Sequence, residues 1–321
     1  MPAHAGRLRP FERCVFSLVF GLMASFVVLV AFMATTTRGH LLLTGPSVAA
    51  PPLAAGLNGS AVQAPTASSP RTHHGSSPAR HQAPSAELLS AALAGALRPV
   101  LGTDPGQLAV GVVDLTSGEA ATYNGGVVLR GGAIVTTDIL AALLLQHQQA
   151  GARLSDHEAE LAADMVENGS AVAASQLWTV IGGAPGLTAA NATLKLRDTS
   201  LAPGANWMWT KTTVADQLQL LEDLAAPNSP LDSASRDYAL GLMTSVSAPQ
   251  PWGVLAAATT GTGAVADGSL LGPRWVIGSI GVIQRDGDEL LVAVLSDHNP
   301  AEPPAISAAR AAVVAAATTV G

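Results

Sequence analysis

The feature that most constrains this chain is an uninterrupted apolar run near its amino terminus. Residues 14–34 read CVFSLVFGLMASFVVLVAFMA and contain neither a charged residue nor a proline over 21 positions. About 20 apolar residues are enough to cross a bilayer core as a helix, and the run exceeds the roughly 7–15 apolar residues of an ordinary signal peptide. The sequence therefore predicts a transmembrane signal anchor at 14–34, and any folded domain must follow it.

Charges on either side of the run predict its orientation. Three arginines lie in the preceding basic segment, residues 1–13, whereas Arg38 is the nearest basic residue after the run. Basic residues that flank a membrane helix stay on the cytoplasmic side. We therefore expect residues 1–13 in the cytoplasm and the rest of the chain outside, as a single-pass protein of the cell membrane. Cleavage after residues 31–34 would instead release a secreted domain.

A segment rich in Pro, Ala, Ser, Thr and Gly separates the apolar run from the remainder of the chain. Residues 35–84 show little hydrophobic periodicity, and such a composition cannot bury enough apolar surface to offset the entropy of an ordered chain. We expect a disordered linker that holds a domain away from the membrane. His73 and His74 lie in it without a further metal ligand nearby, so they are interpreted as solvated linker residues.

Charge and cysteine content exclude several classes of function. Lys and Arg number 16 and Asp and Glu number 23, which gives a formal net charge of −7. Nucleic acid requires a basic face, so no nucleic-acid partner is expected. Cys14 is the only cysteine, which excludes an intrachain disulfide. His, Cys and carboxylate residues do not cluster at the spacing of a metal site, so neither a metal nor another cofactor is expected.

Hydrophobic periodicity predicts the elements of a folded domain. Residues 85–101 carry apolar side chains at helical spacing after Ser85, which predicts a capped helix. QLAVGVVDL (107–115) is typical of a strand, and TSGEAATYNGG after it predicts a hairpin turn and a partner strand. The apolar segment 136–151 predicts a helix, and a helical middle continues to about residue 245.

Two further strands are predicted close to the carboxyl terminus. RWVIGSIGVIQ (274–284) and ELLVAVLSD (289–297) are apolar runs separated by Arg-Asp-Gly-Asp, and Asp-Gly between such runs is a strong hairpin signal. The order of helix, strands, helices and strands indicates an α+β domain at 85–321. Its antiparallel sheet is formed from both ends of the chain and packs with a mainly helical region.

The sequence also resembles a known family, first in the predicted helix at 136–151. In the penicillin-recognising serine hydrolases of the class A β-lactamase type, a Ser-x-x-Lys motif opens a buried helix. Its Ser is the nucleophile, and its Lys helps to remove the proton. The stretch GGAIVTTDILAALL (131–144) resembles that helix, but Ala133 occupies the position of the Ser and Thr136 that of the Lys.

The family's second motif, Ser-Asp-Asn on a loop between helices, is also degenerate in this chain. MVENGSAVAASQLW (165–178) resembles the loop and its surroundings. The three motif positions are held by Gly169, Ser170 and Ala171. The proton-shuttling Ser and the substrate-facing Asn of the family are therefore both replaced.

The third motif, Lys-Thr-Gly on a strand, follows the same trend. GTGAVADGSLLGPRWVIGSIG (261–281) resembles that strand and the next one. The motif positions are held by Ala266, Asp267 and Gly268. The β-lactamases also activate a deacylating water with a Glu on a loop, and the comparable loop at 196–218 contains no Glu.

The resemblance implies the fold of that family without its chemistry. Acyl transfer needs a deprotonated hydroxyl beside a base, and the nucleophile and both general bases are replaced. We interpret Thr136 and Thr137 as helix residues that pack or bond to the preceding turn, Ser170 as a capping hydroxyl and Lys211 as a solvated loop residue. The leading hypothesis is a non-catalytic binding or scaffold domain. The alternatives are an active hydrolase with a non-standard nucleophile and a purely structural envelope protein.

Remnants of the family's groove are the candidate binding residues. The family's oxyanion hole uses backbone N–H groups of the nucleophile residue and of the residue after Lys-Thr-Gly, which correspond to Ala133 and Ser269. Ser170, Asp267 and Gly268 complete the set. If Asp267 faces the groove, its charge should repel a ligand carboxylate, so neutral or cationic ligands are expected. The expected partners are the membrane, through the amino-terminal helix, and a cell-wall peptide or an envelope protein.

Overall fold

The computed structural model describes most of the chain from Ser85 onwards. The described residues are 85–101, 107–202, 204–247 and 252–320. The predicted cytoplasmic segment, signal anchor and linker, at 1–84, therefore lie outside the described residues. Within the described ranges, no helix is both long and apolar enough to cross a bilayer.

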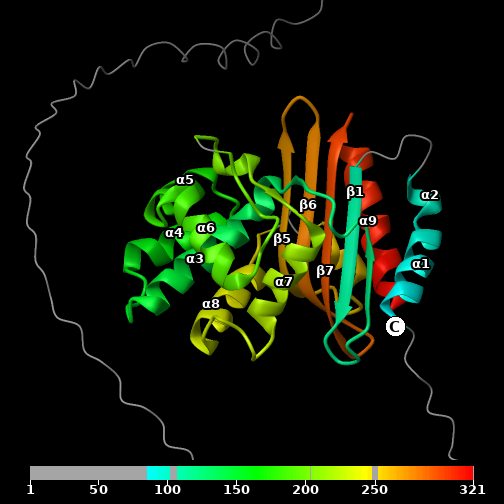
Figure 1. Ribbon diagram of the computed structural model, residues 1–321, viewed down its shortest axis with the longest axis horizontal. Helices are drawn as coiled ribbons and strands as arrows, with labels where there is room; N and C mark the ends of the chain where they lie inside the picture. Colours follow the sequence, from blue (N-terminus) through cyan, green and yellow to red (C-terminus); the bar gives the residue numbers. More distant parts are fainter. Residues whose placement is uncertain (1–84, 102–106, 203, 248–251, 321) are drawn as a thin grey trace, which may run out of the picture. The chain divides into compact units, whose positions relative to one another are not determined.

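A five-stranded antiparallel sheet lies at the centre of the described domain (Figure 1). Its strand order is β2-β1-β7-β6-β5, so the first strands of the domain lie beside the last, and β5 forms one edge. This arrangement confirms the predicted α+β fold with a sheet from both chain ends. The strands span Gln107–Asp114 (β1), Ala120–Tyr123 (β2), Gly263–Leu271 (β5), Trp275–Arg285 (β6) and Asp288–Asn299 (β7).

The predicted hairpin near the carboxyl terminus joins β6 to β7. Arg285 pairs with Asp288, and the two residues between them form the turn. Asp286 and Gly287 have φ angles of 54° and 105°. Positive φ at both central residues is the requirement of the tight turns that suit the twist of a hairpin, which is why Asp-Gly is favoured there.

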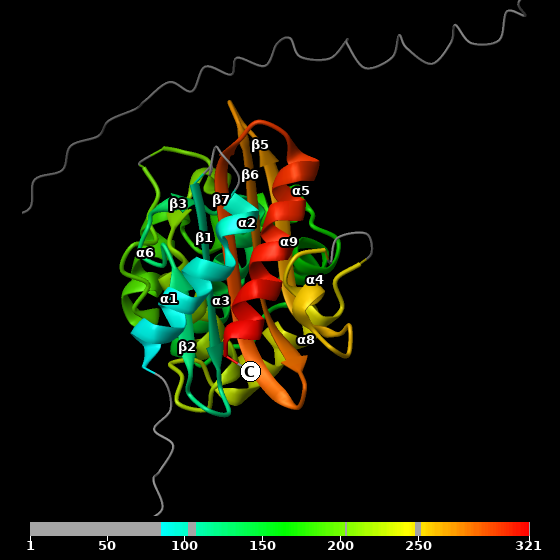
Figure 2. The same cartoon turned by 90° about the vertical axis from the view of Figure 1, so that its right-hand side faces the viewer.

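Three helices cover one face of the sheet, as Figure 2 shows. The predicted helix at 85–101 is confirmed as α1, Ala86–Ala96, and α2, Arg98–Leu101, and the Ser85 hydroxyl accepts the Leu88 N–H at 3.4 Å. The third helix, α9 at Glu302–Thr319, was not predicted. Its buried stripe consists mainly of alanines, whose weak hydrophobic contrast hides the helical period, while their small size lets the helix lie close on the sheet.

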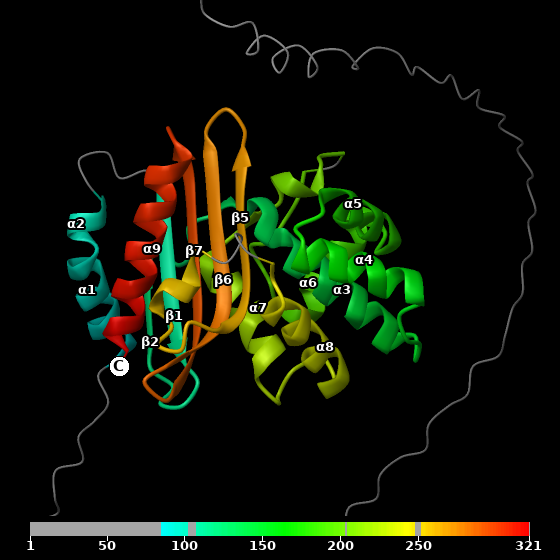
Figure 3. The same cartoon turned by 180° about the vertical axis from the view of Figure 1, so that it is seen from behind.

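The mainly helical region packs on the opposite face of the sheet (Figure 3). Its central helix, α3, is surrounded by α4, α5, α6 and α8 and is buried around most of its circumference. A helix that is apolar on nearly every side belongs in the interior. The helices of this region are Val135–Gln149 (α3), Asp156–Glu167 (α4), Ala171–Val180 (α5), Gly183–Leu194 (α6), Val214–Ala225 (α7) and Ser233–Thr244 (α8).

A small second sheet connects the two regions. It pairs β3, Leu129–Arg130, with β4, Lys211–Thr212. The chain passes from β3 through the short 3₁₀ turn η1, Gly132–Ile134, directly into α3. It approaches β4 through the 3₁₀ turn η2, Trp207–Trp209. The segments β3, η1, η2 and β4 carry most of the residues of the candidate site described below.

Candidate functional site

Residues of the first and third motifs meet at the start of α3. Ala133 is half-buried in η1 and packs against β5. A Cβ atom on Gly268 would overlap the Cβ of Ala133 and lie 3.0 Å from its Cα, so the strand and the turn are in direct contact because residue 268 has no side chain. The first and third motifs therefore converge as the resemblance implies, around a methyl group in place of a hydroxyl.

The hydroxyl of Thr136 is already engaged within its own helix. Its Oγ1 donates to the Ala133 carbonyl at 2.9 Å, one turn back along the chain. This is the bond to the preceding turn that the sequence indicates. Thr137 is buried, and its Oγ1 has no hydrogen-bond partner among the described residues.

The second motif forms the entrance to α5. Gly169 and Ser170 link α4 to α5, and Ala171 is the exposed first residue of that helix. Ser170 Oγ accepts the Ala173 N–H at 3.3 Å, and the Ser170 N–H donates to the Asp164 carbonyl at 3.1 Å. Ser170 is therefore the N-cap of α5, which is the role that its sequence position indicates.

The residues of the third motif point alternately to the two faces of β5. Ala266 is buried in the core shared with α3, on the same side as the contact between Gly268 and Ala133. Asp267 lies on the opposite face, where its carboxylate accepts the Trp252 N–H at 2.6 Å, the Gly253 N–H at 3.2 Å and the Ser279 hydroxyl. Side chains alternate between the faces of a strand. The expectation that Asp267 faces a ligand carboxylate in the groove is therefore wrong.

Burial controls the titration of Asp267. Removal from water raises the pKa of its carboxyl, and the hydrogen bonds from Ser279, Trp252 and Gly253 only partly oppose the rise. Ser269 shares this face, since its hydroxyl is hydrogen-bonded to the carboxylate of Glu302 at the start of α9. Of the candidate binding residues on β5, only Gly268 thus lies on the face of the strand that meets Ala133.

A buried polar network beneath the site was not predicted. Asp138 on α3 is fully enclosed, and Gln217 Nε2 on α7 lies 3.3 Å and 3.4 Å from its two carboxylate oxygens. Burial raises the pKa of the Asp138 carboxyl to about 7, against the opposing hydrogen bond from Gln217, and the charge of Asp216 adds to the rise. The signal in the sequence was a lone carboxylate within an apolar helix, which implies a buried partner.

The network continues to the loop before β4. Gln217 Nε2 also donates to Thr212 Oγ1 at 3.0 Å, and the hydroxyls of Thr212 and Thr199 lie 2.8 Å apart. Thr199 donates to Asp216 Oδ2 at 2.7 Å, while the same carboxylate accepts backbone N–H groups of the loop at 2.8 Å and 3.2 Å. The loop that carries the catalytic Glu in the resembled family is therefore fixed by buried hydrogen bonds.

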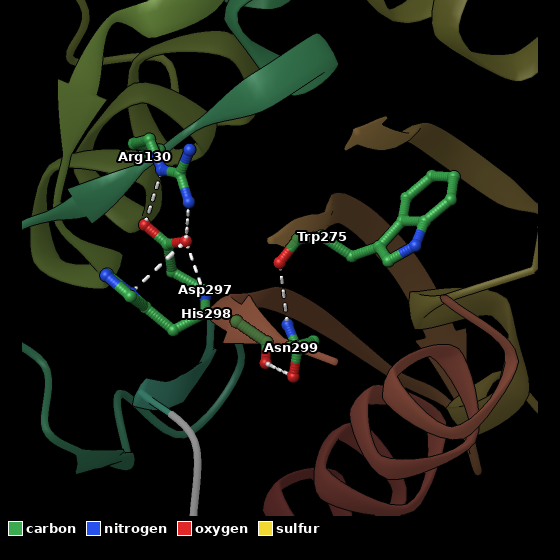
Figure 4. Close-up of polar contacts among 6 residues, drawn as sticks. Arg130, Trp275, Asp297, His298 and Asn299 are labelled. Atoms are coloured by element: carbon green, nitrogen blue, oxygen red, sulfur yellow. Dashed lines mark hydrogen bonds and ion pairs between the residues drawn. The ribbon is translucent and has the colours of Figure 1, made fainter. Parts of the chain in front are cut away.

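A buried ion pair joins β3 to the end of β7 (Figure 4). Two guanidinium nitrogens of Arg130, Nε and Nη2, donate to Asp297, the first at 2.8 Å, and the His298 N–H donates to the same carboxylate at 2.5 Å. Burial alone would raise the pKa of Asp297, but the hydrogen bonds from Arg130 and His298 outweigh it and lower the pKa. Figure 4 also shows Asn299, whose side chain donates to the Trp275 carbonyl at 3.1 Å.

A hollow of about 440 Å³ lies beside this ion pair. The Arg130 guanidinium also lies over the Trp209 ring, 5.3 Å from its centroid. The hollow is lined by Arg130, Ser200, Leu201, Ala202, Ala205, Trp209 and Lys211. The sequence predicts Lys211 as a solvated loop residue, and no motif marks the other lining residues.

Two histidines of the described chain lie beside carboxylates. His147 is paired with Glu158 at 3.2 Å, and His298 lies 3.4 Å from Asp297. Among the hydrogen bonds of the described residues, none joins a Ser or Thr hydroxyl to a lysine amine or an imidazole. No group of three or more potential metal ligands is present in the same part of the chain.

Comparison with known proteins identifies the fold. No protein-family model and no curated protein matches the sequence. Among solved structures, a mutant of the penicillin-binding protein PBP-A, captured as an acyl-enzyme with penicillin G, is 17% identical with a TM-score of 0.63, over 72% of this chain and 96% of that chain. A β-lactamase from Xanthomonas campestris pv. campestris is 18% identical with a TM-score of 0.61, over 73% and 99%.

A third similar structure is an ancestral class A β-lactamase (GNCA). It is 22% identical with a TM-score of 0.59, over 72% of this chain and 98% of that chain. These likenesses confirm the β-lactamase-like serine-hydrolase fold that the order of the three degenerate motifs implies. At such low identity the likeness concerns the fold alone.

Proposed function

We propose that this protein is a non-catalytic binding or scaffold domain of β-lactamase fold, held at the outer face of the cell membrane by the segment 14–34. The observation that carries the proposal is the contact between Ala133 and Gly268 at the position of the family's nucleophile. The carbon atoms that meet there offer no oxygen for acyl transfer, and the hydroxyl of Thr136, at the position of the family's Lys, already donates to the Ala133 carbonyl.

The positions of the lysines support the same conclusion. The chain has two, Lys195 and Lys211. Lys195 ends α6, and Lys211 lies on β4, where it lines the hollow next to Arg130. A lysine that activates a nucleophile must lie within hydrogen-bond reach of it. Both lysines are exposed, and neither is hydrogen-bonded to a hydroxyl of the described chain.

The purified protein should form no covalent adduct with a penicillin reporter. Intact-protein mass spectrometry after incubation with penicillin G should leave its mass unchanged, while an active class A β-lactamase in the same assay confirms the reagent. The matched variant Ala133→Ser restores the hydroxyl without a neighbouring base and should acylate far more slowly than the active enzyme. A stable adduct on any Ser or Thr of the native chain would favour the active-hydrolase alternative. Ser170→Ala and Thr136→Val would then identify the oxygen.

The anchoring part of the proposal rests on the apolar run and the arginines before it. Protease added to spheroplasts should remove the domain at 85–321 and leave a short membrane-bound fragment, because the chain after residue 34 is expected outside the cytoplasm. An antibody against the domain would follow the loss, with a cytoplasmic protein as the control for lysis. Survival of the domain in intact spheroplasts would contradict the proposed orientation.

A further inference from the structure

The geometry points to the hollow beside β3 and β4 as a binding site for a small monoanion that carries an apolar group. The inference rests on the proposed binding function and names its site and ligand class. The hollow measures about 440 Å³, within the roughly 300–1,000 Å³ of small-molecule pockets. Ala133, Gly169 and Ala266 do not line it, so this site differs from the groove of the resembled family.

Backbone hydrogen bonds fix the walls of the hollow. The Ser200 N–H donates to the Lys211 carbonyl at 2.9 Å, and the Lys211 N–H donates back to Ser200 at 2.8 Å. The Trp209 N–H donates to the Asn206 carbonyl at 2.9 Å, which fixes the backbone of the η2 turn that carries the ring. A site that is already formed requires little ordering when its ligand binds.

Contacts with Asp297 and Trp209 hold Arg130 in one orientation. Asp297 binds its guanidinium from the sheet, and the Trp209 ring lies 5.3 Å from it. Gly272 makes this approach possible, because a Cβ atom there would lie 2.8 Å from Trp209 Cη2 and 3.0 Å from Arg130 Nη1. The guanidinium that lines the hollow is therefore fixed before any ligand arrives.

The balance of charge in the hollow selects a monoanion. Asp297 compensates Arg130, whereas Lys211 is exposed and has no ion pair with any residue that the structure describes. Among the residues that the structure describes, no acidic side chain lines the hollow. One positive charge is thus left without a partner, and its ammonium can donate charge-assisted hydrogen bonds to a carboxylate.

The remaining walls select an apolar body for the ligand. The apolar residues of the lining are Leu201, Ala202, Ala205 and Trp209, of which Trp209 is 37% exposed. Indole and aliphatic surfaces gain free energy when an apolar ligand group removes them from water. A carboxylate on a short aliphatic or aromatic group satisfies both the charge and the walls.

A matched pair of probes tests the charge requirement. We would titrate the full-length protein in detergent with 3-phenylpropionate and with 3-phenylpropanamide by calorimetry, using empty micelles as the blank. The acid should bind about tenfold or more tightly than the amide, because a hydrogen bond to a charged group is lost in the amide. Lys211→Gln should lower affinity for the acid about tenfold or more, and Lys195→Gln, which removes the only other lysine, should leave it unchanged.

Chemical modification locates the same site independently. A water-soluble acetylating reagent should modify both lysines of the free protein, and peptide mass spectrometry separates the two positions. Saturating 3-phenylpropionate should slow acetylation of Lys211 and leave that of Lys195 unaltered, whereas the amide should protect neither.

Three outcomes would overturn the inference: equal affinity for acid and amide, unchanged affinity in the Lys211→Gln variant, or no binding of either probe at millimolar concentration. Any of these, combined with the absence of a penicillin adduct, would leave the non-catalytic proposal intact. An adduct with penicillin G combined with protection of Lys211 would instead overturn the proposed function and retain the anion site.

Discussion

Asp138→Asn will stabilise the domain by about 2–4 kcal/mol at pH 8 and by much less near pH 4, because the native carboxyl is buried with a pKa of about 7. The folded pKa lies above the ordinary value of 3.8, so the folded protein holds an additional proton between these pH values. The stability that Asp138 contributes is therefore complete below about pH 4 and is lost as the pH rises through 7. The uncharged Asn does not make this transition.

The surroundings of Asp138 offer a hydrogen-bond donor to the amide oxygen. This oxygen can accept from Gln217 Nε2, as the carboxylate does now. The substitution thus removes a buried charge and keeps the hydrogen bond from Gln217.

Urea unfolding followed by tryptophan fluorescence measures this effect. All five tryptophans follow residue 85, so the signal reports only on the domain. The matched variant Asp223→Asn should give a smaller gain with the same sign, since burial raises the pKa of Asp223 only to about 6. Equal destabilisation of Asp138→Asn at pH 5 and pH 8 would mean that the carboxylate is needed in its charged form.

Most helices and strands could be predicted because their hydrophobic period, caps and turns depend on residues that are consecutive in the sequence. The Asp286–Gly287 turn and Ser85 are examples, since turn geometry and capping depend on single side chains. The α9 helix was missed because its buried stripe is made largely of alanine, and α3 was recognised because its apolar residues extend over about four turns. Fold class follows from such local evidence together with the order of the elements.

The candidate site was less predictable because its contacts join residues far apart in sequence. The resemblance implies that Ala133 and Gly268 lie close together, and they do. Placing Asp267 also requires knowing which residues of β5 point to which face of the sheet. A shift of one residue moves a side chain to the other face of a sheet. Arg130 and Asp297 are 167 positions apart, and no local pattern links them.

Arg130→Met will destabilise the domain by about 3–5 kcal/mol at pH 7, because Asp297 will be left as a buried charge without its partner. The Asp297 side chain is only 4% exposed. In the native protein its pKa is lowered, so the pair contributes stability above the ordinary carboxyl range and loses it as the pH falls. Without Arg130, burial will raise that pKa, and the variant will lose less stability at pH 4 than at pH 7.

The double variant Arg130→Met with Asp297→Asn separates the buried charge from the lost packing. Removing both charges should recover much of the stability, and the remainder reflects the loss of the contact between Arg130 and Trp209. Asp297→Asn alone should cost less than Arg130→Met, since the guanidinium borders the hollow and can be hydrated there. The exposed Arg153→Met variant is the control for removing an arginine and should change little. If the two single variants and the double variant prove additive at pH 7, the pair is not the element that ties β3 to β7.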